Sequence, residues 1–159
     1  MIVAIGCDHA GFPLKARVVL ELENAGHQIV DCGGYDTTPS DYPDFARAVA
    51  TTVIEGRADR GILVCGSGVG ASVAANKVSG ARAALCHDTF SARQGVEDDD
   101  LNVLCLGARV IGVEAAAECI RAFLTARFSN AARHARRLAK VLAIEADARD
   151  GKFDRMGPR

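Results

Sequence analysis

A glycine-rich turn holds the residues with the clearest chemical potential. Residues 65–71 read CGSGVGA and follow the apolar run 61–64, a pattern that predicts a buried strand leading through a tight turn into a helix. Glycines in such a turn let backbone N–H groups close around an anion, with the positive end of the helix behind them. The turn therefore indicates a cradle for a phosphate or an oxyanion, although a tight turn without a ligand has the same pattern.

Cys65 and Ser67 are the reactive side chains of this turn. At the start of a helix, the dipole and the nearby N–H groups would favour a thiolate, so Cys65 could act as a nucleophile or as a base. Its position suits a packed core thiol equally well. Ser67 could orient a substrate oxygen or cap the helix, and spacing alone favours the cap.

The same turn fits a dinucleotide-binding pattern only loosely. Residues 66–71 match GxGxxG/A, and Asp88 follows at about the distance of a ribose-binding carboxylate. However, the turn follows the third expected strand rather than the first. Lys77 is too far from the glycines for a P-loop. A small phosphate or an oxyanion is therefore the favoured guest.

Other polar residues also follow apolar runs. Asp8 and His9 come after the first run, and His87 and Asp88 come after the fourth. Each pair could be a polar turn, but ligands of open parallel sheets bind beyond the carboxyl ends of the strands, which favours a functional role for the first pair. The role of the second pair stays open. His27 precedes a strand at the opposite edge and is interpreted as structural.

Three arginines indicate recognition of an anion. Arg109 follows the last strand, and Arg133 and Arg137 lie one helical turn apart with His134 beside them. A solvated basic helix face is the alternative for the helical pair. The sequence leaves open whether they reach the site of their own chain or that of a partner.

The elements that must position these residues alternate regularly. Strand-like and helix-like runs follow one another, which predicts an α/β fold: a three-layer α/β/α Rossmann-like arrangement with a five-stranded parallel sheet and a C-terminal helix. The expected strands cover residues 2–6, 28–31, 61–64, 83–86 and 103–106. The expected helices cover 14–24, 44–55, 71–77, 89–96, 113–127 and about 130–149, the last with Leu138, Val141, Leu142 and Ile144 as its apolar stripe.

Composition sets the outer limits. A chain of 159 residues with 49% hydrophobic residues predicts one globular domain, residues 1–149, followed by a mobile tail at 150–159. A net charge of −1 gives no reason to expect nucleic acid or a membrane as partner. The chain opens directly into a strand-like run, so we expect a cytoplasmic protein. Its six cysteines lack zinc-site spacing, so no metal is expected.

Several stretches of the sequence, taken together, resemble one family. It is the family of type B ribose-5-phosphate isomerase and its relatives, which include the galactose-6-phosphate isomerase subunits. The matching stretches are GCDHAGFPLK, SDYPDFA, RGILVCGSGVGASVAANKV, GARAAL, NVLCLGARVIG and ARHARR, spread from residue 6 to residue 137. The resemblance implies an aldose–ketose isomerase of a small sugar phosphate, with ribose 5-phosphate as the default substrate. It also implies a homodimer or a dimer of dimers with shared active sites, and no metal or organic cofactor.

The resemblance also assigns roles to residues. Cys65 matches the base that moves a proton between C1 and C2 through a cis-enediolate, since Ala71 stands where another branch has a glutamate. Ser67 matches a hydroxyl residue near that proton. The matching amides for the enediolate belong to Gly66, Gly68, Val69 and Gly70. The matching substrate and phosphate contacts are Asp8, His9, Arg109, Arg133, His134 and Arg137, some of them from a neighbouring subunit.

One departure concerns the substrate. Asp98 and Asp99 stand where the ribose enzymes have a His-Asn pair that opens the sugar ring and binds the substrate. The pair His87–Asp88 is closer to relatives that act on acyclic tetrulose phosphates. Either His87 has taken over ring opening, or the substrate is an acyclic sugar phosphate. A nucleotide- or sugar-phosphate-binding domain without turnover is the alternative from another class.

Overall fold

Five parallel strands form the centre of the molecule. The structure is a computed structural model that describes residues 1–153. The strands lie in the order β2-β1-β3-β5-β4. Their bounds are β1 (Ile2–Cys7), β2 (Gln28–Asp31), β3 (Arg60–Cys65), β4 (Ala83–Leu85) and β5 (Val103–Gly107). The order reverses between β1 and β3, where open α/β sheets bind their ligands. The predicted five-stranded parallel sheet is confirmed.

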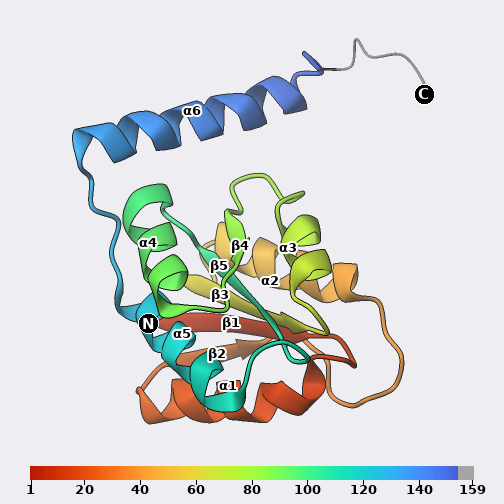
Figure 1. The fold of residues 1–159 in the computed structure, drawn as a ribbon. Helices are drawn as coiled ribbons and strands as arrows, with labels where there is room; N and C mark the ends of the chain where they lie inside the picture. Colours follow the sequence, from red (N-terminus) through yellow and green to blue (C-terminus); the bar gives the residue numbers. More distant parts are fainter. Residues whose placement is uncertain (154–159) are drawn as a thin grey trace.

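Helices cover both faces of this sheet (Figure 1). They are α1 (Phe12–Asn24), α2 (Tyr42–Ile54), α3 (Val69–Ala75), α4 (Thr89–Asp99), α5 (Val113–Thr125) and α6 (Ala132–Arg149). Because side chains alternate along a strand, each face has its own core. Helices α1, α4 and α5 pack on Ile5, Ile62 and Leu104 on one face. Helices α2 and α3 pack on Leu63 and Cys65 on the other, which confirms the three-layer α/β/α prediction.

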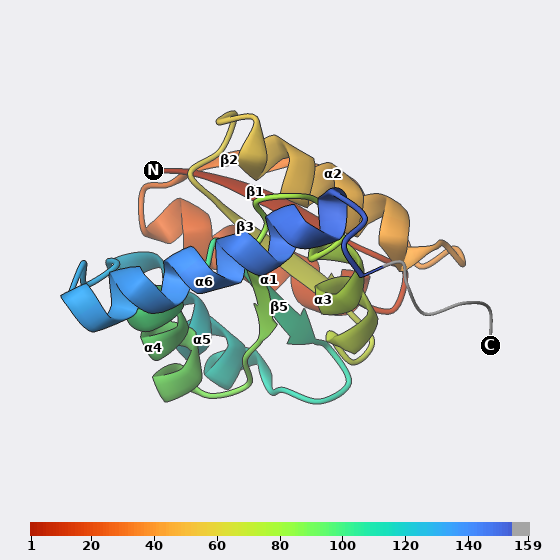
Figure 2. The ribbon, with the colours of Figure 1, turned by 90° about the horizontal axis from the view of Figure 1, so that it is seen from above.

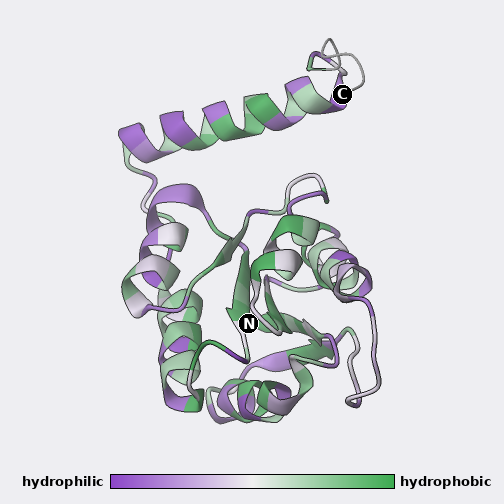
Figure 3. Ribbon diagram, turned by 45° about the vertical axis from the view of Figure 1, so that its right-hand side comes forward, coloured by the Kyte–Doolittle hydropathy of each residue, from purple (hydrophilic) through white to green (hydrophobic). Residues whose placement is uncertain are grey.

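Helix α6 lies apart from the other layers (Figures 1 and 2). Its predicted apolar stripe does not enter the core of its own chain, since Val141, Leu142 and Ile144 are each more than 40% exposed. Figure 3 shows hydrophobic residues midway along this separated helix. Between α6 and the body lies a groove of about 710 Å³. In the single chain, both the apolar stripe of α6 and the walls of the groove are therefore accessible to solvent.

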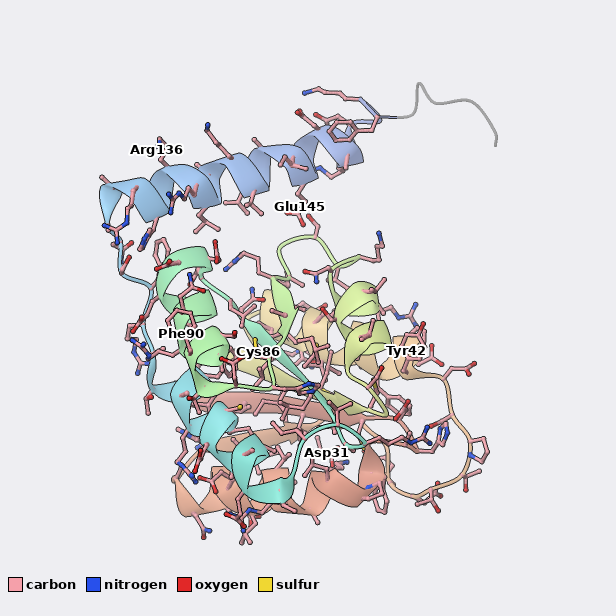
Figure 4. All side chains as sticks on the ribbon, in the orientation of Figure 1. Asp31, Tyr42, Cys86, Phe90, Arg136 and Glu145 are labelled. Atoms are coloured by element: carbon pink, nitrogen blue, oxygen red, sulfur yellow. The ribbon has the colours of Figure 1, made fainter. Side chains whose placement is uncertain are left out.

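Two contacts hold α6 in this position. At its start, His134 is buried and lies between Ser129 and Asp98 of the body. Further along, the Glu145 carboxylate accepts a hydrogen bond of 2.8 Å from the Gly80 N–H (Figure 4). The helix is thus anchored near both ends and crosses the groove between them.

The C-terminal residues extend the last helix slightly. Residues 150–153 form a turn in which the Gly151 N–H donates to the carbonyl of Ala148, with Gly151 at φ 70°. The rest of the expected mobile tail, 154–159, lies outside the described residues. Within residues 1–153, none of the helices combines the length and the apolar character needed to cross a bilayer.

Candidate active site

A cavity of about 380 Å³ opens at the carboxyl ends of β1 and β3. The residues around it come from the ends of three strands and from the start of α2. They are Asp8, His9, Ala10, Tyr42, Cys65, Gly66, Ser67, Gly70, Arg109 and Val110. Seven of these ten are residues that the sequence predicts for the site. The larger groove beneath α6 contains none of these strand ends.

Cys65 is the last residue of β3 and the only thiol that lines the cavity among the described residues. It is 4% exposed, and its sulfur accepts a hydrogen bond of 3.0 Å from the Gly68 N–H. An N–H pointed at sulfur stabilises negative charge there. Ala71, which is also buried, brings no carboxylate to this core. The sulfur of Cys65 is one of the groups of the cavity that can accept a proton, together with the Asp8 carboxylate and the His9 ring.

The other buried thiols are poor candidates for chemistry. Burial raises the pKa of Cys7 and of Cys86 to about 11, and it raises the pKa of Cys105 further. Burial also raises the pKa of Cys119. These four cysteines are packed side chains of the core.

The glycine turn after Cys65 has a shape that side chains would prevent. Gly68 has φ 82°, in the left-handed region, and a Cβ there would overlap the side chain of Leu85. The exposed Ser67 hydroxyl accepts a hydrogen bond of 3.3 Å from the Val69 N–H. The N-cap of α3 is Gly68 and not Ser67, but the Ser67 hydroxyl satisfies the N–H of the first helical residue. Its hydroxyl hydrogen is not used by that contact and can be donated to a ligand.

Asp8 and His9 are fixed by backbone groups. The Asp8 carboxylate accepts a hydrogen bond of 2.8 Å from the Gly11 N–H and is 6% exposed. A Cβ on Gly11 would overlap the Val64 carbonyl, so only glycine allows this close turn beside β3. The His9 ring contacts both the N–H and the carbonyl of Ser40 through Nδ1, at 3.1 and 3.2 Å. Those contacts leave Nε2 of His9 as the ring atom available to a ligand.

The sequence did not predict the roles of Tyr42, which lines the cavity, or of Lys15, which lies behind it. Tyr42, at the start of α2, lines the cavity, and a Cβ on Gly70 would press against its ring (Figure 4). Lys15 is 5% exposed; its ammonium pairs with Asp31 at 2.7 Å and donates to the carbonyls of residues 33 and 34. Lys15 therefore holds residues 33 and 34 in place. These residues belong to the same loop as Ser40, whose backbone contacts the His9 ring at the cavity. The only sequence signal was a lysine on the apolar side of the first helix.

Arg109 lies at the glycine turn, whereas His87 lies beside β5 and Asp88 lies at the start of α4. The Arg109 N–H donates to the Gly66 carbonyl at 3.0 Å, and its exposed side chain lies along the glycine turn. His87 lies beside β5, and its Nε2 accepts a hydrogen bond of 2.9 Å from the Gly107 N–H. The Asp88 carboxylate caps α4 by accepting from the Ser91 N–H, and this hydrogen bond lowers the pKa of Asp88. Its capping role gives the dinucleotide interpretation no support.

A second group of predicted site residues lies elsewhere. Helix α4 starts at the carboxyl end of β4 and runs back along the sheet, so its last residues lie near the amino ends of the strands. None of the residues in this group lines the cavity: Asp98, Asp99, Arg133, His134 and Arg137. Arg136, on the same turn of α6 as the two predicted arginines, lies at the opposite end of the molecule from Tyr42 (Figure 4). The single chain therefore holds the predicted site residues in two separate groups.

The contacts of this second group are defined. Asp98 accepts a hydrogen bond of 2.6 Å from the Gln94 amide and lies 3.2 Å from Nδ1 of His134. The same nitrogen lies 2.6 Å from the Ser129 hydroxyl. His134 thus faces its own chain through Nδ1, whereas Arg133 and Arg137 are exposed. In residues 1–153, no three His, Cys, Asp or Glu side chains come together as ligands for a metal; the absence of metals and cofactors stays a prediction.

Fold and cavity define the class of protein. A three-layer α/β domain with a cysteine, a glycine cradle and polar strand ends around one cavity is suited to the chemistry of small anionic substrates. The family model described as Ribose/Galactose Isomerase matches residues 3–141. The chain belongs to this family of isomerases.

Individual relatives agree with this assignment. The chain is 43% identical over 143 residues to ribose-5-phosphate isomerase B of Escherichia coli, covering 90% of this chain and 95% of that one. It is 44% identical over 128 residues to D-erythrulose-4-phosphate isomerase of Pectobacterium atrosepticum, covering 79% and 84%. The solved ribose-5-phosphate isomerase B of Clostridium thermocellum superimposes with a TM-score of 0.91 at 42% identity, covering 93% and 99%.

Proposed function

We propose that the protein interconverts the aldose and ketose forms of a small sugar phosphate, with Cys65 as the base. The observation that carries this proposal is the buried Cys65 sulfur, which accepts the Gly68 N–H inside the cavity. Family membership supports the isomerase chemistry. Ala71 supports the choice of base, because the alternative carboxylate is missing.

The chemistry of an aldose–ketose isomerisation through an enediolate gives the order of events. The Cys65 thiolate takes the proton from C2 of the open-chain aldose, which forms a cis-enediolate. The thiol then returns a proton to C1, while a proton moves from the C2 hydroxyl to the oxygen on C1, and the ketose results. The N–H groups of Gly66 and Gly70, which line the cavity, would stabilise the negative oxygen. A preorganised donor of this kind contributes roughly 3 kcal/mol to the transition state. The other two predicted amides, those of Gly68 and Val69, donate to the Cys65 sulfur and the Ser67 hydroxyl in this structure.

The complete site takes two chains. In this proposal Arg133 and Arg137 hold the substrate phosphate, yet neither lines the cavity of its own chain. The exposed stripe of α6 and the groove beneath it are surfaces that a second copy can cover. A dimer related by two-fold symmetry would bring α6 of each chain to the cavity of the other. We assign a homodimer, alone or paired into a tetramer, with shared active sites.

The substrate class depends on Asp98. A histidine opens a furanose ring because it exchanges protons near neutral pH, and a carboxylate does so much less readily. The contacts of Asp98 with Gln94 and His134 use both of its oxygens, which further limits its freedom as a base. Ribose 5-phosphate is the family's default substrate, but Asp98 favours an acyclic tetrulose or tetrose phosphate. The similarity to a D-erythrulose-4-phosphate isomerase supports this preference.

The remaining expectations follow from this function. Residues 1–149 would act as one catalytic unit, without a metal or an organic cofactor. The polar substrate is a metabolite of the cytoplasm, and we place the enzyme there. No nucleic acid or membrane takes part in the reaction.

A deuterium experiment separates turnover from binding alone. The purified protein is incubated in D2O with C4 to C6 aldose and ketose phosphates, and products are followed by NMR. An isomerase working through an enediolate incorporates solvent deuterium at the carbon that receives the proton. Binding of these sugars without product or deuterium would favour the non-catalytic alternative.

A further inference from the structure

The contact between His87 and Gly107 lies where two strands separate. Strand β4 ends at Leu85, whose partner in the register is Cys105. Strand β5 continues to Gly107, where a longer β4 would have offered a carbonyl to the Gly107 N–H. The acceptor is instead Nε2 of His87, at 2.9 Å. The imidazole therefore takes the place of a strand carbonyl and adds one hydrogen bond at the end of the β4–β5 pairing.

Gly107 supports the catalytic turn directly. It is the register partner of Cys65, and the next residue, Ala108, donates its N–H to the Cys65 carbonyl at 2.9 Å. A Cβ on Gly107 would overlap the Ser67 carbonyl, so its bare Cα lies against the backbone of the glycine turn. Any displacement of Gly107 would therefore displace Cys65 and the cradle together.

We propose that His87 is a positioning residue, which holds Gly107 and thereby sets the distance between Cys65 and the anion cradle. This inference rests on the proposed isomerase function. A nitrogen that accepts an N–H carries no proton, so the ring is neutral with its hydrogen on Nδ1. Nε2 is then not available to exchange protons with a sugar ring. His87 thus acts through Gly107 and not as the group that opens a furanose.

Three substitutions separate these roles. Gln at position 87 can place its amide oxygen near the position of Nε2 and accept the Gly107 N–H, whereas Phe fills the space without an acceptor and Ala does neither. We expect His87→Gln to keep kcat within about threefold of wild type. His87→Phe and His87→Ala should lower kcat by at least about tenfold with little change in KM, since small misplacements in an active site are costly. His27→Gln, at the other edge of the sheet, is the control.

The choice of substrate supplies the second test. A positioning role predicts the same loss on cyclising ribose 5-phosphate and on an acyclic tetrulose 4-phosphate, because both reactions need the cradle. A ring-opening role predicts a loss on ribose 5-phosphate alone, without rescue by Gln, and that result would overturn the proposal. Thermal unfolding of each variant is measured alongside. A kcat loss in His87→Phe that appears only near its unfolding temperature would also overturn it.

NMR of the wild-type protein tests the contact without any turnover. With 15N-labelled histidine, we expect the His87 signals of the tautomer that carries hydrogen on Nδ1. The tautomer with hydrogen on Nε2 would overturn the proposal whatever the activity. A wild-type chain that is inactive on every sugar phosphate would instead overturn the proposed function. Loss of activity in the His87 variants alone leaves the proposed function intact, so the two failures can be distinguished.

Discussion

Replacing Cys65 by alanine removes the proton acceptor and leaves most of the cavity in place. The side chain is 4% exposed, and its one polar contact is the 3.0 Å hydrogen bond from Gly68. The residues expected to hold the sugar and its phosphate belong to other elements. Cys65→Ala should therefore change kcat and leave KM nearly constant.

The size of the effect follows from the role of the sulfur. A general base typically contributes a factor of roughly 10²–10⁴, which corresponds to about 2.7–5.5 kcal/mol of activation free energy. The cradle amides would still stabilise the enediolate, so some catalysis by water should survive. We expect kcat to fall at least about 100-fold, measured by a coupled assay on ribose 5-phosphate and on a tetrulose 4-phosphate.

Cys65→Ser is the matched control for this change. Serine can accept the Gly68 N–H and preserve the turn, but its hydroxyl is a far weaker acid than a thiol and supplies almost no anionic base at neutral pH. Both variants should therefore be nearly inactive, with thermal stability close to that of wild type. Recovery of turnover in Cys65→Ser would mean that position 65 serves only to shape the turn. A kcat within tenfold of wild type in Cys65→Ala would refute the assignment of the base.

Three further outcomes are expected. Mixing inactive Cys65→Ala chains with inactive Arg137→Ala chains should restore about a quarter of the wild-type activity. Half of the dimers in an equal mixture contain one chain of each kind, and one of the two sites in each such dimer is intact. No recovery after verified subunit exchange would place each site within one chain. Asp98→His should raise kcat/KM for ribose 5-phosphate several-fold and leave tetrulose 4-phosphate unchanged, and high wild-type ribose activity without a gain would contradict the substrate assignment. In chemical denaturation, the free energy of unfolding should fall as the pH rises above about 9. Thiols of the unfolded chain ionise there, whereas burial keeps the pKa of Cys7 and Cys86 at about 11 in the folded chain. A free energy of unfolding that stays constant from pH 8 to 11 would argue against these buried thiols.

Local patterns were sufficient to predict the sheet and the glycine turn. The apolar run before Cys65 and the glycines after it define a strand, a turn and a helix without help from distant residues. The expected strands therefore agree with β1 to β5 within a residue or two at each end. The resemblance to the isomerase family supplied the roles of residues, which no spacing alone could provide.

Tertiary contacts explain what the sequence did not reveal. Lys15 looks like a polar residue of an amphipathic helix, but Asp31 and two loop carbonyls surround its ammonium only after folding. Tyr42 enters the cavity because Gly70, on another element, leaves room for its ring. The apolar stripe of α6 was predicted from its periodicity, but periodicity could not say whether the same chain would cover the stripe, which is exposed in the structure.

The separation of the two groups of predicted site residues has a consequence for specificity. The proton-transfer group, with Cys65 and the glycine cradle, is fixed by the sheet and by the contact of His87 with Gly107. The other group, with Asp98 and the arginines of α6, does not line the cavity of Cys65 in the same chain. A substitution at Asp98 can therefore alter which sugar is accepted without moving the base that acts on it. In the proposed dimer, such a division would let one scaffold keep the enediolate chemistry, while the group supplied by the partner would determine the length and the cyclic or open form of the substrate.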